Sequence, residues 1–289
     1  MLHCICEATL ARTRFSDKHD LMRCPACQTG KFVDREQESM VEFNYDSSDD
    51  KYGNETYLNT PEFRWAHDEL AKLDWTGCRV LEIGCFTGFF LDRLRGLGAD
   101  VTGVEVNREA VAAGERLYGL AGRICPDLDS LPSDSQFDRI VMIDVLEHIE
   151  QPGPFLATVL PLLKPGGTLS ISSPTIERRF HDKSDFPPHH HWWFSREGLR
   201  RLTTRSGLEL AGASIQHDGM LLFRNVIGRT LYGFSRREFN GEGSETISAI
   251  ARSGDGTIPY RVATRLGELA LRAIGFQYCS YLFHARKAG

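Results

Sequence analysis

Three histidines and three large aromatic side chains lie together in one short stretch of the chain, residues 185–195, which reads DFPPHHHWWFS. Histidine has an unperturbed pKa near neutrality, so it can remove the proton of a hydroxyl group under physiological conditions. The two prolines favour extended backbone, which predicts a loop rather than a helix or a central strand. Trp192, Trp193 and Phe194 would either keep water from a site or pack on an underlying sheet. The stretch therefore offers a general base in a shaped loop.

Another histidine, His148, lies in the segment DVLEHIEQP, directly after an apolar run. Its imidazole is a second candidate for the general base. Together with Asp144 and Glu147, His148 could instead bind a divalent metal ion, which would lower the pKa of a hydroxyl group directly. The residues alone leave these alternatives open.

The chain holds eight cysteines, and four of them lie in its first 27 residues. Cys24 and Cys27 have the Cys-x-x-Cys spacing of a zinc knuckle. The second pair of ligands would be Cys4 and Cys6, or else His3 and Cys6, because tetrahedral zinc accepts both residue types. A redox-active pair is disfavoured, since no βαβ pattern surrounds Cys24 and Cys27. We therefore expect structural zinc in a small amino-terminal ribbon.

Short apolar runs alternate with helical patterns through the middle of the chain. Strands are expected at 78–85, 100–106, 122–126, 137–144 and 167–174, and helices at 88–98 and 107–119. A turn, LKPGG, precedes the last of these strands, and two later runs, 208–215 and 278–287, would form antiparallel strands at one edge. Asn107 and Ser195 are the N-cap candidates for the helices that follow them. The alternation predicts a doubly wound α/β fold with a mostly parallel, seven-stranded sheet, helices on both faces and sites at the carboxyl ends of the strands.

The segment LEIGCFTGFF decides which cofactor such a sheet could bind. A dinucleotide fingerprint, G-x-G-x-x-G, needs small residues where the pyrophosphate approaches the backbone, but Phe86 and Phe89 occupy its second and third glycine positions, which disfavours NAD. Four other features of a nucleotide site remain. Glu82 is an acid at the end of the first strand, and Gly84 and Gly88 follow it in the turn. Glu105 is a second acid, about twenty residues beyond the first glycine. An acid at that last position reaches ribose hydroxyls, so the site fits a nucleoside without a pyrophosphate.

Four segments in order and spacing resemble those of class I S-adenosylmethionine-dependent methyltransferases, over roughly residues 60–215. They are VLEIGCFTG, VTGVEV, FDRIVMIDVLEHI and LKPGGTLSISSP. The resemblance implies a Rossmann-like fold and S-adenosylmethionine as cofactor. Phe86 replaces a glycine that is usual in this family, so the loop over the methionine part of the cofactor is expected to differ. A cofactor-binding protein without catalysis is the alternative that this departure suggests.

The resemblance also assigns residues to the cofactor site. The acid and the glycines of the first segment would frame the methionyl ammonium and carboxylate groups, the acid of the second segment would hold the ribose, and Asp127 with Leu128 would border the adenine. The full set of expected cofactor-binding residues is Glu82, Gly84, Cys85, Phe86, Gly88, Glu105, Val106, Asp127, Leu128 and Asp144.

Family members often carry a PPHH segment at the place of residues 187–190, which points to His189 and His190, over His191, as the base, with His148 as the rival. The zinc knuckles and the EHI segment are similar to those of methyltransferases of sugars and natural products. The core is similar to ubiquinone-biosynthesis O-methyltransferases, some of which bind a metal near the LEH segment. We expect methyl transfer to a hydroxyl of a sugar or natural-product intermediate. A carbon or nitrogen acceptor, or an RNA recognised through the zinc ribbon, is the alternative.

The composition limits the kinds of partner that the chain is expected to bind. A net charge of −5 without a basic stripe argues against nucleic acid. No apolar run is long enough to span a bilayer and no signal-peptide pattern opens the chain, so we expect a cytoplasmic protein with a small-molecule substrate and without stable membrane insertion. A homodimer is compatible with this.

The expected organisation has three parts. Residues 1–32 form the zinc-knuckle element, 33–59 an acidic linker or cover, and 60–289 the methyltransferase domain. An insertion at about 219–276 would form a pair of helices on the sheet edge, a lid over the acceptor, or a patch that meets a membrane-borne carrier.

Overall fold

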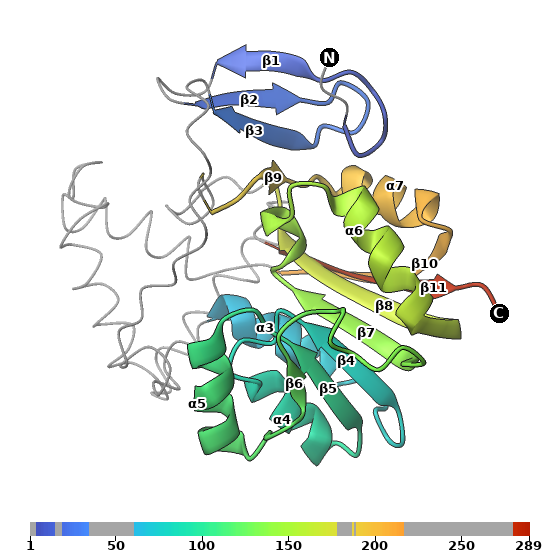
Figure 1. Ribbon diagram of the computed structural model, residues 1–289. Helices are drawn as coiled ribbons and strands as arrows, with labels where there is room; N and C mark the ends of the chain where they lie inside the picture. Colours follow the sequence, from blue (N-terminus) through green and yellow to red (C-terminus); the bar gives the residue numbers. More distant parts are fainter. Residues whose placement is uncertain (1–3, 15–18, 35–60, 178–186, 188, 217–279) are drawn as a thin grey trace, which may run out of the picture.

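The computed structural model describes residues 4–14, 19–34, 61–177, 187, 189–216 and 280–289 (Figure 1). Most of the expected linker, the whole of the expected insertion at 219–276 and the candidate zinc ligand His3 lie outside these residues. Among the described residues, no helix is long and apolar enough to cross a membrane.

A seven-stranded sheet forms the centre of the fold, with the order β10-β11-β8-β7-β4-β5-β6. Its strands are β4 (Arg79–Ile83), β5 (Asp100–Val104), β6 (Ile124–Cys125), β7 (Phe137–Ile143), β8 (Leu163–Pro174), β10 (Leu208–Ile215) and β11 (Ser280–Lys287). The strands from β6 to β8 are parallel, and β11 pairs antiparallel with both β8 and β10. The doubly wound, mostly parallel sheet predicted from the sequence is confirmed.

Helices cover both faces of this sheet, as Figure 1 shows. They are α3 (Pro61–Leu70), α4 (Phe89–Gly96), α5 (Arg108–Tyr118), α6 (Pro152–Val159) and α7 (Arg196–Arg205), with 3-10 turns η1 (Leu146–His148) and η2 (Leu160–Leu162). Successive strand residues point to opposite faces. Leu81 of β4 belongs to the apolar cluster that contains Leu156 of α6, whereas its neighbour Val80 belongs to the cluster that contains Leu94 of α4. Both faces are therefore buried, which explains why the strands read as continuous apolar runs.

Two helix starts follow from their N-cap residues. The Asn107 side chain accepts hydrogen bonds from the backbone N–H groups of Glu109 and Ala110, and the Ser195 hydroxyl accepts one from Gly198. Each cap satisfies backbone donors that the first turn of a helix leaves without intrahelical partners. The predicted caps are confirmed.

Strand β8 begins earlier than the sequence predicts. Leu163 already pairs with Phe137 of β7, and the next regular pair is Thr168 with Arg139. The register shifts between these pairs, and Gly166 in the middle has φ 75°. The LKPGG segment, expected as a turn before the strand, is therefore an irregularity inside it.

A second, small sheet has the order β1-β2-β3-β9. Strands β1 (Ala11–Arg14), β2 (His19–Arg23) and β3 (Gly30–Asp34) come from the amino-terminal region, whereas β9 (Trp192–Trp193) comes from the histidine-rich stretch. The loop prediction holds for residues 189–191, but the two tryptophans form an edge strand and are buried. Figure 1 shows β9 between the small sheet and the part of the chain that contains the seven-stranded sheet. The amino-terminal element is thus completed by a distant part of the chain.

Candidate active site

The first turn of the candidate site follows β4. Gly84 has φ 72°, and its N–H donates to the carbonyl oxygen of Val104 at 2.8 Å. A Cβ at Gly84 would lie 2.5 Å from Cγ2 of Val145, the residue that precedes η1. Only glycine combines this left-handed backbone with so close an approach. The turn is therefore packed directly against the segment that carries His148.

Two acidic residues lie at the carboxyl ends of β4 and β5, as the sequence predicts. Glu82 is 3% exposed, and its Oε2 has no hydrogen-bond partner among the described residues. Burial raises the pKa of Glu82 well above its ordinary value, and the nearby charge of Glu105 raises it further. A buried carboxyl group in this state holds a proton or requires a cation. Glu82 thus fits an ammonium group that approaches from the turn.

The second acid, Glu105, organises the backbone around it. The N–H of Phe86 donates to Oε2 at 2.9 Å and the N–H of Asn107 donates to Oε1 at 2.8 Å. Each carboxylate oxygen can accept more than one hydrogen bond, so the two oxygens retain capacity for hydroxyl donors. Glu105 therefore joins the β4 turn to the start of α5 and fits a ribose diol.

The departure at Phe86 has a structural explanation. Phe86 has φ 52°, the left-handed conformation that glycine adopts without strain. Its ring is half-buried and packs against Ala110 and Ala113 of α5. The phenylalanine therefore keeps the backbone of a glycine turn, including the hydrogen bond to Glu105, and changes the side chain presented there.

Helix α5 touches the loop after β4 through a glycine. A Cβ at Gly114 would lie 2.1 Å from the carbonyl oxygen of Thr87, a residue that is fully buried. At the loop's end, Gly88 has φ 74° and is the N-cap of α4. The left-handed backbone at Gly88 thus requires the expected glycine. Gly114 is a further position that requires glycine, because of its close approach to Thr87, and no motif in the sequence predicts it.

The remaining expected cofactor residues lie at the same edge of the sheet. Val106 is 77% exposed, although the adjacent Glu105 is buried. Asp127 is exposed and accepts hydrogen bonds from the N–H and the hydroxyl of Ser130, which lower its pKa. Leu128 is half-buried. Cys85, the last of this group, is buried beside β5.

Asp144 follows β7 with φ 51° and accepts a hydrogen bond from the Ser172 hydroxyl at 2.8 Å. A left-handed aspartate at a strand end is a strained position of the kind that recurs at functional sites. Its carboxylate is thereby directed to β8. Asp144 does not belong to the cluster of possible metal ligands that Glu147, His148 and His190 form.

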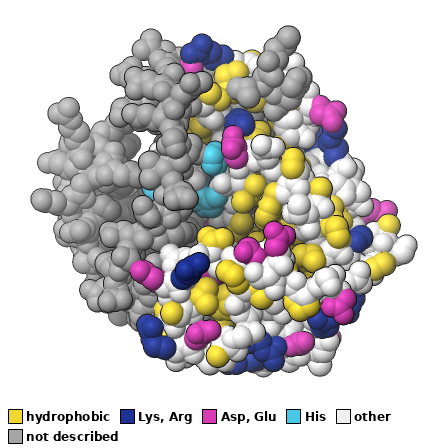
Figure 2. All heavy atoms as spheres, in the orientation of Figure 1, with side chains coloured by type: hydrophobic (Ala, Val, Ile, Leu, Met, Phe, Trp, Pro, Cys, Tyr) yellow, Lys and Arg dark blue, Asp and Glu magenta, His cyan; other side chains and the backbone are white. Residues whose placement is uncertain are grey.

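His148 and His190 lie next to each other in this cluster. Nδ1 of His148 lies 2.6 Å from the carbonyl oxygen of His189, and the His148 and His190 rings meet edge to face with centroids 4.7 Å apart. His190 is buried, whereas the His189 side chain is exposed. Burial lowers the pKa of His148. Figure 2 shows histidine side chains close together on one face of the molecule.

The His148 tautomer follows from this contact. A carbonyl oxygen only accepts hydrogen bonds, so Nδ1 carries the hydrogen and the lone pair of the neutral ring is on Nε2. In this tautomer the neutral His148 ring can accept a proton at Nε2. The contact uses the backbone carbonyl of His189, whose side chain is exposed.

The same group could hold a metal ion, but not with the expected ligands. Glu147, His148 and His190 each offer a ligand atom, and these atoms lie within 4.8 Å of one another. The ligand set expected from the sequence was Asp144 with Glu147 and His148. His190 takes the place of Asp144 because the 189–191 segment folds back onto η1.

The amino-terminal cysteines converge. The Sγ atoms of Cys4, Cys6, Cys24 and Cys27 all lie within 4.8 Å of one another, and the described cysteines form no disulfide. Two of the pairs are separated by 3.5 Å and 3.4 Å, close to the roughly 3.8 Å expected between sulfur ligands of a tetrahedral zinc ion. A hydrogen bond from the Cys4 thiol lowers the pKa of Cys27 to about 4. The donor set Cys4, Cys6, Cys24 and Cys27 fits zinc, and the alternative ligand His3 lies outside the described residues.

Comparison with known proteins agrees with this geometry. Residues 52–212 match a family described as a methyltransferase domain, which is more than half of the chain. The chain belongs to this family of class I S-adenosylmethionine-dependent methyltransferases.

Two curated relatives illustrate the similarity in sequence. The ubiquinone biosynthesis O-methyltransferase of Burkholderia lata is 31% identical over 125 residues, covering 40% of this chain and 51% of that protein. The corresponding protein of Xanthomonas oryzae pv. oryzae is 34% identical over 110 residues, which cover 36% of this chain and 46% of that protein. The chain spans about half the length of the curated relatives it matches.

Two solved structures share the fold. The N-methyltransferase NodS of Bradyrhizobium japonicum, in complex with S-adenosyl-L-homocysteine, aligns with a TM-score of 0.50 at 18% identity, covering 83% of this chain and 96% of NodS. Phosphoethanolamine N-methyltransferase 2 of Haemonchus contortus, in complex with S-adenosyl-L-methionine, aligns with a TM-score of 0.54 at 14% identity, covering 96% and 71%. At these identities the likeness concerns the fold alone.

Proposed function

We propose that this chain transfers a methyl group from S-adenosylmethionine to a hydroxyl group of a small molecule, a sugar or natural-product intermediate, and that His148 removes the hydroxyl proton. The observation that carries the proposal is the contact of His148 Nδ1 with the His189 carbonyl, which fixes the base tautomer. The residue that precedes the η1 turn of His148, Val145, packs against the turn at Gly84. The match to ubiquinone biosynthesis O-methyltransferases supports an oxygen acceptor.

The cofactor residues of the chain have distinct tasks. Glu82 would bind the ammonium group, Glu105 would accept hydrogen bonds from the ribose hydroxyls, and exposed Val106 would pack against the adenine with Asp127 and Leu128 at its border. S-adenosylmethionine supplies a methyl group on a sulfonium whose departure as a neutral thioether needs no acid. Catalysis by the protein therefore consists of alignment and proton removal.

The proton moves to His148. As the acceptor oxygen bonded to the methyl carbon, the carbon–sulfur bond would break and leave a neutral thioether, and Nε2 of His148 would take the proton of the breaking O–H bond. The lowered pKa keeps the ring neutral before the reaction. His190 packs edge to face on it and restricts its orientation.

A second candidate mechanism is supported by the three ligand atoms of Glu147, His148 and His190. A divalent ion there would lower the pKa of the acceptor hydroxyl, and His148 would be a ligand rather than the base. Activity that requires added Mg²⁺ at constant zinc content would favour this mechanism.

We also propose that Cys4, Cys6, Cys24 and Cys27 bind a structural zinc ion. The close approach of all four sulfur atoms supports it. Measurement of zinc content in the purified chain and in Cys24→Ser tests it, with one equivalent expected in the first and a loss in the second.

The experiment is incubation of the purified chain with methyl-labelled S-adenosylmethionine and separate small-molecule and RNA fractions of a cell extract. Label in the small-molecule fraction is expected. His148→Gln should reduce the rate by about 100-fold or more, whereas His189→Ala, which keeps the backbone carbonyl, should change it little. The reverse order would identify His189 as the base, and label in RNA would overturn the small-molecule acceptor.

A further inference from the structure

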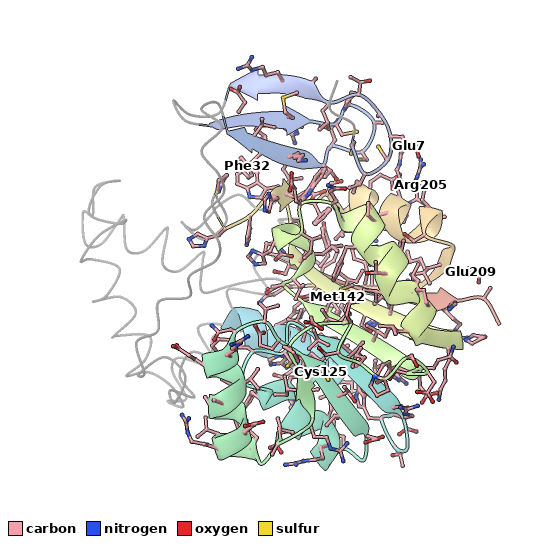
Figure 3. All side chains as sticks on the ribbon, viewed as in Figure 1. Glu7, Phe32, Cys125, Met142, Arg205 and Glu209 are labelled. Carbon is pink, nitrogen blue, oxygen red and sulfur yellow. The ribbon has the colours of Figure 1, made fainter. Side chains whose placement is uncertain are left out.

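Strand β3 of the small sheet holds the histidine-rich segment directly. Gly30 and Lys31 pair antiparallel with Trp193 and Trp192, and the N–H of Phe32 donates to the carbonyl oxygen of His191 at 2.9 Å. The Phe32 and Trp193 rings meet edge to face with centroids 4.8 Å apart. Figure 3 shows Phe32 at this junction.

The other side of the same segment contacts the turn that carries His148. The N–H of His191 donates to the carbonyl oxygen of Glu147 at 2.9 Å, and Trp192 Nε1 donates to the carbonyl oxygen of Glu150 at 3.1 Å. The His191 peptide thus lies between β3 and η1. The backbone of this segment also supplies the carbonyl that fixes His148, so its position determines the geometry of the base.

The zinc knuckle is joined to the segment by a buried hydroxyl pair. Oγ1 of Thr29 lies 3.2 Å from both the hydroxyl and the backbone N of Ser195, and the Ser195 hydroxyl donates to the carbonyl oxygen of Cys27. Thr29 is fully buried and Ser195 is 1% exposed. A Cβ at Gly198 would lie 1.9 Å from the Thr29 hydroxyl, so helix α7 is in close contact with the knuckle.

A third contact lies at the other end of α7. Arg205 pairs with Glu7, and its guanidinium also donates to the carbonyl oxygen of Cys6. Figure 3 shows Glu7 and Arg205 facing each other between the small sheet and α7. Both halves of the cysteine site, Cys6 and Cys27, therefore contact the chain that follows the histidines.

We propose that the zinc-binding sheet positions the base His148 and the His190 ring that packs on it, with Thr29 and Ser195 as positioning residues. The inference rests on the proposed function and on the zinc site. Three short strands and a two-residue edge strand bury too little apolar surface to hold their shape alone, so the bound metal maintains the sheet. Loss of the metal releases β3 from His191, and the His148–His190 pair loses its alignment.

The cofactor site belongs to different elements. Glu82 and Glu105 lie at the ends of β4 and β5, which are strands of the central sheet. Zinc content should therefore govern kcat while leaving the KM for S-adenosylmethionine and the affinity for S-adenosylhomocysteine close to their original values.

The test compares the full, zinc-loaded chain with its Thr29→Val and Thr29→Ser variants. Valine keeps the shape of threonine and removes the hydroxyl without touching a cysteine. We expect Thr29→Val to retain zinc and to keep its S-adenosylhomocysteine affinity within about threefold, while kcat falls by about 10-fold or more. Thr29→Ser keeps the hydroxyl group, so its kcat should stay close to that of the unchanged chain. Ser206→Ala is the matched control, because this hydroxyl lies at the far end of α7 and donates only to Leu202 among the described residues.

Hydrogen exchange supplies a readout independent of turnover. The His191 amide should exchange faster in Thr29→Val and in chelator-treated protein, whereas the Gly103 amide, bonded within the central sheet to Arg123, should not. Unchanged exchange at His191 together with unchanged kcat would overturn the inference. If exchange responds as expected but no form transfers methyl groups, the positioning contact stands and the proposed function fails.

Discussion

Nδ1 of His148 donates a hydrogen bond to the backbone carbonyl of His189 at 2.6 Å, so the neutral ring presents its lone pair on Nε2. Burial lowers the pKa of His148 below the ordinary histidine value. A base must be unprotonated, so kcat should be constant above about pH 7 and fall only as the pH drops through the lowered pKa. A pH–rate profile measures this, and a limb centred above the ordinary value would contradict it.

Glu82 should control cofactor affinity. Glu82→Gln removes the charge that would bind the ammonium group, so S-adenosylhomocysteine affinity should fall by about 10-fold or more. The exposed Glu109, replaced by Gln, is the control for the same change of charge. Calorimetric titration measures both affinities, and equal effects of the two substitutions would remove Glu82 from the site.

Glu82 should also affect stability. Its folded-state pKa is raised, so the unfolded chain releases this proton at lower pH than the folded chain does. The free energy of unfolding should therefore decrease as the pH rises above about 4.5, the range in which the unfolded carboxyl ionises. In Glu82→Gln this decrease should be smaller. Denaturant unfolding at several pH values, without cofactor, measures the difference.

Gly114 and Gly96 provide a matched pair of helical glycines. A Cβ at Gly114 would lie 2.1 Å from the Thr87 carbonyl oxygen, whereas a Cβ at Gly96 would meet nothing within 4 Å among the described residues. Gly114→Ala should destabilise the protein by about 1–3 kcal/mol and weaken cofactor binding, because α5 must move from the loop. Gly96→Ala should stabilise it by about 0.5–1 kcal/mol. Denaturant unfolding compares them, and equal effects would contradict the contact.

His67 should make the protein sensitive to acid. It stacks on Phe90 with ring centroids 4.4 Å apart, and burial, with the Arg93 charge second, lowers its pKa from 6.5 to about 4. Between these values the unfolded chain binds a proton that the folded chain does not. Stability should therefore fall by about 2 kcal/mol between about pH 7 and pH 5 from this group. His67→Phe keeps an aromatic ring and should reduce that loss, and an unchanged pH dependence would contradict the assignment.

Much of the central domain could be predicted because its signals are local. Leu81 and Val80 are both apolar since both faces of a parallel strand are covered, and Asn107 and Ser195 cap helices through hydrogen bonds to residues two or three positions away. The sequence predicts the position of the LKPGG segment correctly but indicates a turn before the strand, whereas the segment lies inside β8. Proline and glycine mark an irregularity equally well in either place.

Local patterns in the sequence were sufficient for the doubly wound sheet, for the acids Glu82 and Glu105 at its carboxyl edge and for Cys24 and Cys27 as candidate metal ligands, with either Cys4 and Cys6 or His3 and Cys6 as the second pair. These follow from periodicity and spacing along the chain. Tertiary structure alone decided that Trp192 and Trp193 join the small sheet, that His190 rather than Asp144 accompanies Glu147, and that the His189 backbone sets the tautomer of His148. Such contacts join residues far apart in the sequence through backbone groups. Every residue carries these groups, so the residue types in the sequence do not predict the contacts.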